Sequence, residues 1–173
     1  MDVLEAINGR RSIRAYVEKD ISEDVITQLL SMAIMAPSAG NRQAWDFIVV
    51  RNLETKKALA RAALDQNFII SAPVVIVVCA NQTRSAQRYG SRGADLYCIQ
   101  DSAAAIQNLL LAAHSLELGT CWVGAFNESN VSKILDIPDG VRPIALIPVG
   151  YAARKPHPPS RLPLAHVLHH ERY

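Results

Sequence analysis

Three arginines and a serine stand close together near the amino terminus, in the segment Arg10-Arg11-Ser12-Ile13-Arg14. A guanidinium group presents several donors in a planar fork, so it binds phosphate by charge-assisted, bidentate hydrogen bonds. Arg10, Arg11, Ser12 and Arg14 are therefore candidate phosphate ligands. A solvated basic loop is the commoner explanation of such a segment taken alone.

A second candidate segment, Ala36 to Trp45 (APSAGNRQAW), is made of small and amide residues between a predicted helix and a predicted strand. Small side chains let a planar ligand approach the backbone, and Asn and Gln offer donors and acceptors to the edge of a heterocycle. An ordinary helix-to-strand loop would explain the segment about as well.

Two further segments fit the same kind of ligand. Leu118 to Phe126 (LGTCWVGAF) is typical of a strand that ends in small residues, where a free backbone N–H group is able to donate to a ring nitrogen. Arg154 and Lys155 form a cationic pair that would complete a phosphate site or remain solvated.

The elements that must position these segments are predicted from the spacing of apolar residues. Helices are predicted from Val3 onward, after Ser22 and ending before Pro37, and over residues 54–64, 95–118 and 128–135. Strands are predicted over residues 45–50, 73–79, 120–123 and 142–151, the second of them buried on both faces. Helices and strands do not alternate strictly, so we expect an α+β fold with a mixed, mostly antiparallel sheet flanked by helices.

The length of 173 residues suits one domain, covering residues 1–173. Its longest predicted helix, residues 95–118, is apolar nearly all round, and the polar pairs 100/101, 107/108 and 114/115 predict one narrow exposed edge. Four prolines between residues 156 and 163 require the tail, residues 152–173, to begin as an extended chain that lies across a surface.

Composition excludes several classes of protein. The net charge of +2 is too small to indicate a nucleic-acid partner, and the most apolar run, residues 71–80, is too short to span a membrane. The chain starts without the basic and apolar regions of a signal peptide, and Cys79, Cys98 and Cys121 show no metal or disulfide spacing. We therefore expect a cytoplasmic protein with reduced thiols, and neither a membrane nor a nucleic-acid partner.

Together the four candidate segments resemble the nitroreductase family, and in particular its short single-domain branch. The likeness rests on RRSIRAY at 10–16, APSAGNRQAWDFIVV at 36–50, the stretch from LYCIQ to CWVGAF at 96–126, and IPVGYAARKP at 147–156. The resemblance implies an α+β fold, an intertwined homodimer, and two FMN molecules bound by residues of both chains. The tail, residues 152–173, would cross onto the partner subunit.

The resemblance also implies a role for each candidate residue. Arg10, Arg11 and Ser12 would hold the phosphate and ribityl chain, Arg14 would face the pyrimidine edge of the ring, and Arg154 and Lys155 would return to the phosphate. The residues that would reach the same flavin from the other subunit are Pro37, Ser38, Ala39 and Asn41. Those that would lie along the ring are Trp122, Val123, Gly124 and Ala125, with the N–H group of Gly124 or Ala125 directed at the ring nitrogen N5.

The implied activity is hydride transfer from NADH or NADPH to FMN, followed by reduction of a nitroaromatic, a quinone or a similar acceptor in a ping-pong cycle. No catalytic side chain is expected, because the flavin carries the chemistry. Relatives that fragment flavin or remove halogen, and a flavin-binding sensor without turnover, are the alternatives.

Arginines 84, 88 and 92 succeed one another at helical spacing within residues 80–94, the part of the chain able to serve as a lid. We hypothesise that they form one basic face that attracts the phosphates of NAD(P)H, against the alternative of a solvated face. His166, His169 and His170 have helix-compatible metal spacing, but the resemblance implies that they pack on the partner chain, so no metal site is expected. The apolar neighbours of Cys121 favour a buried, unreactive thiol.

Overall fold

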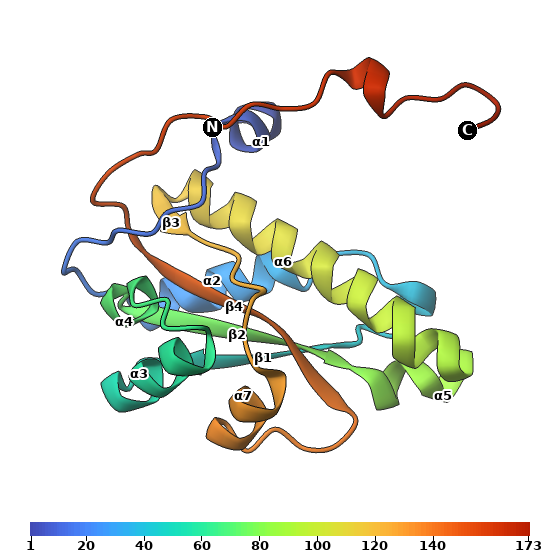
Figure 1. Cartoon of the computed structure of the whole chain (residues 1–173), viewed down its shortest axis with the longest axis horizontal. Coiled ribbons are helices and arrows are strands. Elements are labelled where there is room, and N and C mark those ends of the chain that lie inside the picture. Colours follow the sequence, from blue (N-terminus) through green and yellow to red (C-terminus); the bar gives the residue numbers. More distant parts are fainter.

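The computed structural model describes residues 1–173, and its centre is one four-stranded sheet with the order β1-β2-β4-β3 (Figure 1). The strands are β1 (Trp45–Val50), β2 (Val74–Asn81), β3 (Leu118–Thr120) and β4 (Val141–Tyr151). All three strand pairs are antiparallel, and a parallel bridge between Ser12 and Thr120 adds the amino-terminal segment beside β3. The predicted α+β fold with a mixed, mostly antiparallel sheet is confirmed.

Helices cover both faces of the sheet, and the central strand β2 explains why. Alternate residues of a strand point to opposite faces, so Val74, Ile76 and Val78 enter one apolar cluster while Val75, Val77 and Cys79 enter another. The helices α2 (Glu23–Ala33) and α6 (Cys98–Ser115) pack over the first cluster. The helices α3 (Leu53–Ala62), α4 (Phe68–Ser71) and α7 (Glu128–Ile134) pack over the second. β2 is buried on both faces, as predicted.

Side-chain caps start the helices where the sequence places suitable residues. Asp2 and Glu5 form a capping box on α1 (Val3–Gly9), and the side chain of Ser22 accepts the amide of Val25 at the start of α2. Asn52 and Asn127 cap α3 and α7 in the same way. The predicted helix positions are confirmed here to within a few residues, whereas the four-residue helix α4 was not predicted.

The predicted helix over residues 95–118 is correct in its centre and wrong at both ends. Gly90, with a φ of 55°, interrupts the regular helix within α5 (Gln82–Arg92), and a π-helical turn over Gly93–Tyr97 precedes α6. At the other end α6 stops at Ser115, and β3 then begins at Leu118. The predicted strand over residues 120–123 is therefore displaced, and Val123 pairs only through an isolated bridge to Leu146.

The carboxyl-terminal tail leaves the sheet beside the amino-terminal segment. The amide of Ala153 donates to the carbonyl of Ala15 at 2.9 Å, and the remaining tail runs away from the sheet with only a short 3-10 turn at Leu164–His166 (Figure 1). Because this turn ends at His166, the helical spacing proposed for the histidines is absent. The tail and α1 expose the apolar side chains Leu162, Leu164, Val167, Leu168, Val3, Leu4 and Ile7. None of the helices combines the length and apolar character that crossing a membrane requires.

Candidate functional site

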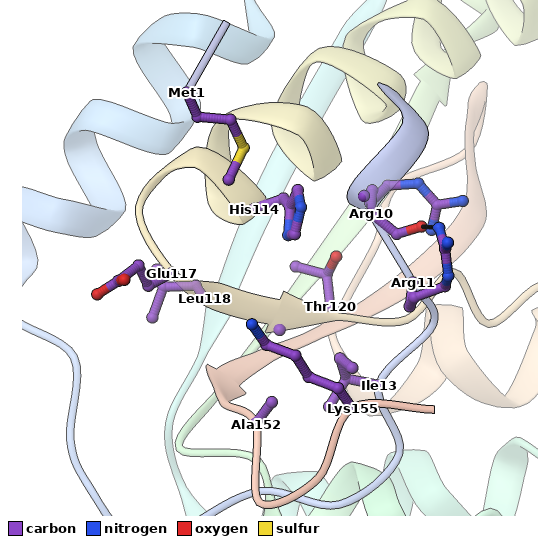
Figure 2. A pocket seen from close by; sticks show the side chains of 12 residues that line it. Met1, Arg10, Arg11, Ile13, His114, Glu117, Leu118, Thr120, Ala152 and Lys155 are labelled. Atoms are coloured by element: carbon purple, nitrogen blue, oxygen red, sulfur yellow. Dashed lines mark hydrogen bonds between the residues drawn. The ribbon is translucent and has the colours of Figure 1, made fainter. Parts of the chain in front are cut away.

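A small cavity lies where the amino-terminal segment, the end of α6, β3 and the start of the tail meet (Figure 2). Its volume is about 140 Å³. Arg10 and Arg11 line it from the segment after α1, His114 from the last turn of α6, and Lys155 from the tail. The fold thus brings three basic side chains and an imidazole, which are far apart in the sequence, around one space.

The cations of this cavity have no carboxylate partner. The structure contains five salt bridges, which use Arg51 twice, Lys57, Arg84 and Arg142 as cations. Arg11 instead donates to the backbone carbonyls of Asn8 and Arg10, at 2.6 and 2.8 Å. Glu117 also lines the cavity but forms no ion pair. Uncompensated cations around a concave space are what binding of an anion such as phosphate requires.

The position of the two arginines depends on how the amino-terminal segment docks beside β3. The amide of Ile13 donates to the carbonyl of Thr120 at 2.8 Å, and Tyr16 forms an antiparallel bridge with Ala152. Ile13 is buried, and its side chain packs directly on Gly119, where an added Cβ would lie 2.7 to 2.9 Å from three of its carbon atoms. A residue with a side chain at position 119 would therefore displace this segment.

Arg14 lies at the other end of the same segment. Three residues separate it from Arg10, so the two Cα atoms are at most about 14 Å apart, and its guanidinium carbon is 5.9 Å from the centre of the Phe68 ring. Burial raises the pKa of the neighbouring Cys121 thiol, and the charge of Arg14 opposes this effect. The raised pKa and burial of Cys121 agree with a thiol that is unreactive at neutral pH.

The segment from Trp122 to Ala125 comes after β3 and combines one buried residue with three exposed ones. Val123 is buried and exchanges backbone hydrogen bonds with Leu146 at 3.0 Å. Trp122, Gly124 and Ala125 are exposed, and the amides of Gly124 and Ala125 donate no hydrogen bond within the chain. Two free N–H groups therefore stand on an open surface close to Arg14.

Sequence reasoning missed Gln66, in the turn between α3 and α4, and Phe68, the first residue of α4. The side-chain amide of Gln66 donates to the carbonyl of Ala125 at 3.2 Å, and Phe68 lies under Arg14. Gln66 therefore borders the exposed segment after β3, and Phe68 borders Arg14. Their spacing in the sequence does not distinguish them from their neighbours, so only the folded arrangement reveals them.

The loop from Pro37 to Asn41 lies near the opposite end of α6 (Figure 1). The amide of Ala39 in this loop donates to the Asp101 carboxylate at 2.9 Å. Asp101 and His114 are separated by thirteen residues of α6, or about 20 Å along the helix axis. Pro37, Ser38, Ala39 and Asn41 are therefore remote, within one chain, from the cations of the cavity.

The predicted site residues consequently fall into two groups. One chain brings together Arg10, Arg11, Ser12, Arg14, Trp122, Val123, Gly124, Ala125 and Lys155. It leaves Pro37, Ser38, Ala39 and Asn41 apart. Arg154, although adjacent to Lys155, is exposed and does not line the cavity.

The arginines of α5 do not form a single basic face. Arg84 is turned inward, where it pairs with Asp46 at 2.9 Å and donates to the carbonyls of Gln43 and Trp45. Arg88 and Arg92 remain exposed and unpaired with any carboxylate, each lying over a neighbouring tyrosine ring. The hypothesis of a three-arginine face is therefore wrong for Arg84.

The fold and this cation-lined cavity define a class of α+β protein with a candidate anion site at the edge of the sheet. The sequence profile of the nitroreductase family matches residues 7–70 and 63–151 of this chain. The chain belongs to the nitroreductase family.

Individual relatives agree with this assignment. A protein of Methanothermobacter thermautotrophicus, whose name pairs NADH dehydrogenase with NAD(P)H nitroreductase, is 38% identical over 160 residues, covering 90% of this chain and 80% of that relative. A Bacillus subtilis protein named FMN reductase [NAD(P)H] is 28% identical over 185 residues, covering 99% of this chain and 74% of that relative. The solved structure of NfrA2 from B. megaterium superposes with a TM-score of 0.92 at 29% identity, covering 100% of this chain and 76% of that one.

Proposed function

We propose that this protein is an FMN-dependent oxidoreductase that takes hydride from NADH or NADPH and passes the electrons to a small organic acceptor. The observation that carries the proposal is the cluster of cations without a carboxylate partner, close to an exposed segment with two free backbone amides. Membership of the nitroreductase family and a relative named FMN reductase [NAD(P)H] support it.

The residues present fit FMN in both charge and spacing. Arg10, Arg11 and Lys155 would hold the phosphate, while Ser12 would bind the ribityl chain and Arg14 the pyrimidine edge of the ring. A Cα separation of up to about 14 Å between Arg10 and Arg14 suits a ligand whose anionic end and polar ring edge lie far apart. When bound, FMN supplies the two-electron hydride chemistry for which the chain has no side chain.

The chain's own residues would position and polarise this ring. The guanidinium of Arg14 would stabilise negative charge at the pyrimidine edge, and the free amide of Gly124 or Ala125 would donate to a ring nitrogen. Trp122 and Val123 would lie along the ring. The exposed side of this segment admits the nicotinamide first and the acceptor afterwards, so the two substrates use one space in turn. Nitroaromatics and quinones, which are planar electron acceptors, suit such a ping-pong cycle.

The remaining site residues require a homodimer. The loop that holds Pro37, Ser38, Ala39 and Asn41 contacts Asp101, about 20 Å along α6 from His114, so a second copy would supply these residues to each flavin. Exposed apolar side chains on α1 and on the tail support association, because isolated domains seldom expose so many. In this arrangement the tail, residues 152–173, crosses onto the partner subunit.

An absorbance spectrum and a subsequent anaerobic titration test the proposal. We expect the purified protein, supplied with FMN, to retain a yellow flavin spectrum through gel filtration and to bleach on addition of NADH or NADPH. Oxygen, menadione or a nitroaromatic should then restore the colour. A retained flavin that neither nucleotide bleaches would indicate a sensor in place of a reductase, and failure to retain FMN would overturn the proposal.

Arg88 and Arg92 provide a prediction about the nucleotide. Because they are exposed and lack a carboxylate partner, we expect Arg88→Ala/Arg92→Ala to raise the KM for NADPH about threefold to tenfold, with kcat maintained. Steady-state kinetics with menadione would measure the effect. The variant Arg61→Ala/Lys133→Ala, which removes two cations from a shallow surface cavity, is the matched control. An unchanged KM for NADPH would show that α5 does not contact the nucleotide.

A further inference from the structure

The side chain of His114 lines the cationic cavity from the last turn of α6. Figure 2 shows its imidazole facing the same space as Arg10 and Arg11. The environment of this imidazole is set by burial and by nearby charges, and it includes no hydrogen bond to a protein group. Neither ring nitrogen is engaged by a protein group, so the imidazole is able to form a hydrogen bond with a ligand in the cavity.

The backbone of α1 is adapted to this imidazole. A Cβ added at Gly9 would lie 2.6 Å from Nε2 of His114, so the ring packs against the glycine backbone at the end of α1. This contact fixes the ring beside the first residue of the basic segment, Arg10. The half-buried imidazole therefore packs at the cavity wall against α1.

The charges around His114 disfavour its protonation when the cavity holds no anion. Burial is the largest cause that lowers the pKa of His114, and the charges of Lys155, Arg10 and Arg11 add to it. The charged side chains that line the cavity with the imidazole are Arg10, Arg11, Glu117 and Lys155. Three of these four groups are positive, and the single carboxylate pairs with none of them.

We infer that His114 is a proton-accepting ligand for the FMN phosphate: its imidazole takes up a proton on binding and donates to a phosphate oxygen in the complex. The inference rests on the proposed function, because it assumes that the anion is the phosphate of FMN. A phosphate dianion reverses the local electrostatics, since its two negative charges offset the neighbouring cations and favour the charged imidazole. Binding then takes up one proton.

Proton uptake determines the sign of the pH dependence. Binding raises the pKa of His114 from a value below that of free histidine, so affinity is highest at low pH and falls as the pH rises towards the pKa in the complex. Between the two pKa values the Kd changes by up to about tenfold per pH unit. The phosphate itself, with a second pKa of about 6, would produce the opposite trend on becoming a dianion.

Fluorescence titration and calorimetry on the flavin-free, full-length protein test the inference. We expect the Kd for FMN to rise about tenfold from about pH 6.5 to about pH 8, and the enthalpy to depend on the ionisation enthalpy of the buffer as uptake of a proton requires. Riboflavin, which lacks the phosphate, should bind more weakly and without this dependence. His114→Gln keeps a hydrogen-bonding side chain but does not titrate, so its Kd for FMN should not rise with pH. Arg61→Ala/Lys133→Ala, which removes two cations from another surface cavity, is the control and should keep the rise of Kd with pH that the wild type shows.

The outcomes separate this inference from the proposed function. Binding of FMN without proton uptake, or a rise of Kd with pH that persists in His114→Gln, would overturn the inference and leave the oxidoreductase assignment intact. Binding of riboflavin with the same pH dependence as FMN would also overturn it, because the phosphate would then not be involved. Failure of the wild type to bind FMN at any pH would overturn the proposed function and the inference with it.

Discussion

Arg10→Ala/Lys155→Ala is expected to weaken FMN binding by about a hundredfold to ten-thousandfold. A hydrogen bond to a charged group contributes about 1.5–3 kcal/mol, and each substitution removes at least one such bond to the phosphate. The two cations reach the cavity from opposite ends of the sequence, so the loss of both leaves Arg11 as the only permanent cation at its wall. Titration of flavin-free protein, monitored by flavin fluorescence, measures the change.

The double variant should fold normally, because neither side chain takes part in a salt bridge. Removing two like charges from one cavity even relieves repulsion in the unliganded protein. Circular dichroism and the midpoint of thermal unfolding would verify this. The matched control Arg61→Ala/Lys133→Ala has the same change in net charge at another surface cavity and should keep wild-type affinity.

Comparison with riboflavin identifies the part of the ligand that the cations bind. The affinity of Arg10→Ala/Lys155→Ala for riboflavin should equal that of the wild type, because riboflavin offers no phosphate. If the variant lost affinity for FMN and riboflavin equally, the two cations would contribute to binding of the flavin ring or to the folded structure, and not to binding of the phosphate. If it bound FMN as tightly as the wild type does, the phosphate would have to bind elsewhere.

The sequence predicts the fold well where local chemistry and long-range packing agree. The seven-residue apolar run of β2 leaves no polar face, so it identifies a strand covered by helices on both sides. Ser22 and the acidic residues after it start α2 where a helix dipole and a capping side chain both favour it. Each of these two signals is contained in one short segment of the sequence.

Predictions fail where a contact between distant residues decides the outcome. Asp101 belongs to the polar stripe expected to be exposed, yet it is buried, because its carboxylate accepts the amide of Ala39 from another loop. Its pKa is raised by burial, with the bond from Ala39 opposing the effect. Arg84 likewise leaves the predicted basic face to reach Asp46. Spacing within one segment contains no information about partners more than thirty residues away.

The candidate site likewise contains some residues that local sequence indicates and others that only contacts between distant segments reveal. Residue type alone made Arg10 and Arg11 candidate phosphate ligands, and the structure places both at the wall of the cavity. Residue type did not separate Lys155, which lines the cavity, from its neighbour Arg154, which does not. It also gave no reason to place His114 among the cations, because that contact depends on α6 ending beside α1.

The docking of the amino-terminal segment on β3 supplies the second large effect. A Cβ at residue 119 would lie 2.7 to 2.9 Å from Cγ1, Cβ and Cγ2 of Ile13, and a β-branched side chain cannot turn all three atoms away. We expect Gly119→Ala to lower the free energy of unfolding by about 1–3 kcal/mol, as overpacking does. Because Arg10 to Arg14 would move with Ile13, FMN affinity should fall in parallel.

A double-mutant cycle distinguishes this clash from a general cost of replacing glycine. Ile13→Ala alone should cost about 2–5 kcal/mol through the cavity it creates, but Gly119→Ala/Ile13→Ala should cost less than the sum, with a coupling of about 0.5–3 kcal/mol. Gly124→Ala is the matched glycine control, since a Cβ there meets only Trp122 at 3.7 and 3.9 Å. Urea unfolding of the wild type, the two single variants, the double variant and Gly124→Ala gives the free energies of unfolding. Additive costs, or a Gly119→Ala variant as stable as Gly124→Ala, would mean that Ile13 does not hold the arginine segment against the sheet.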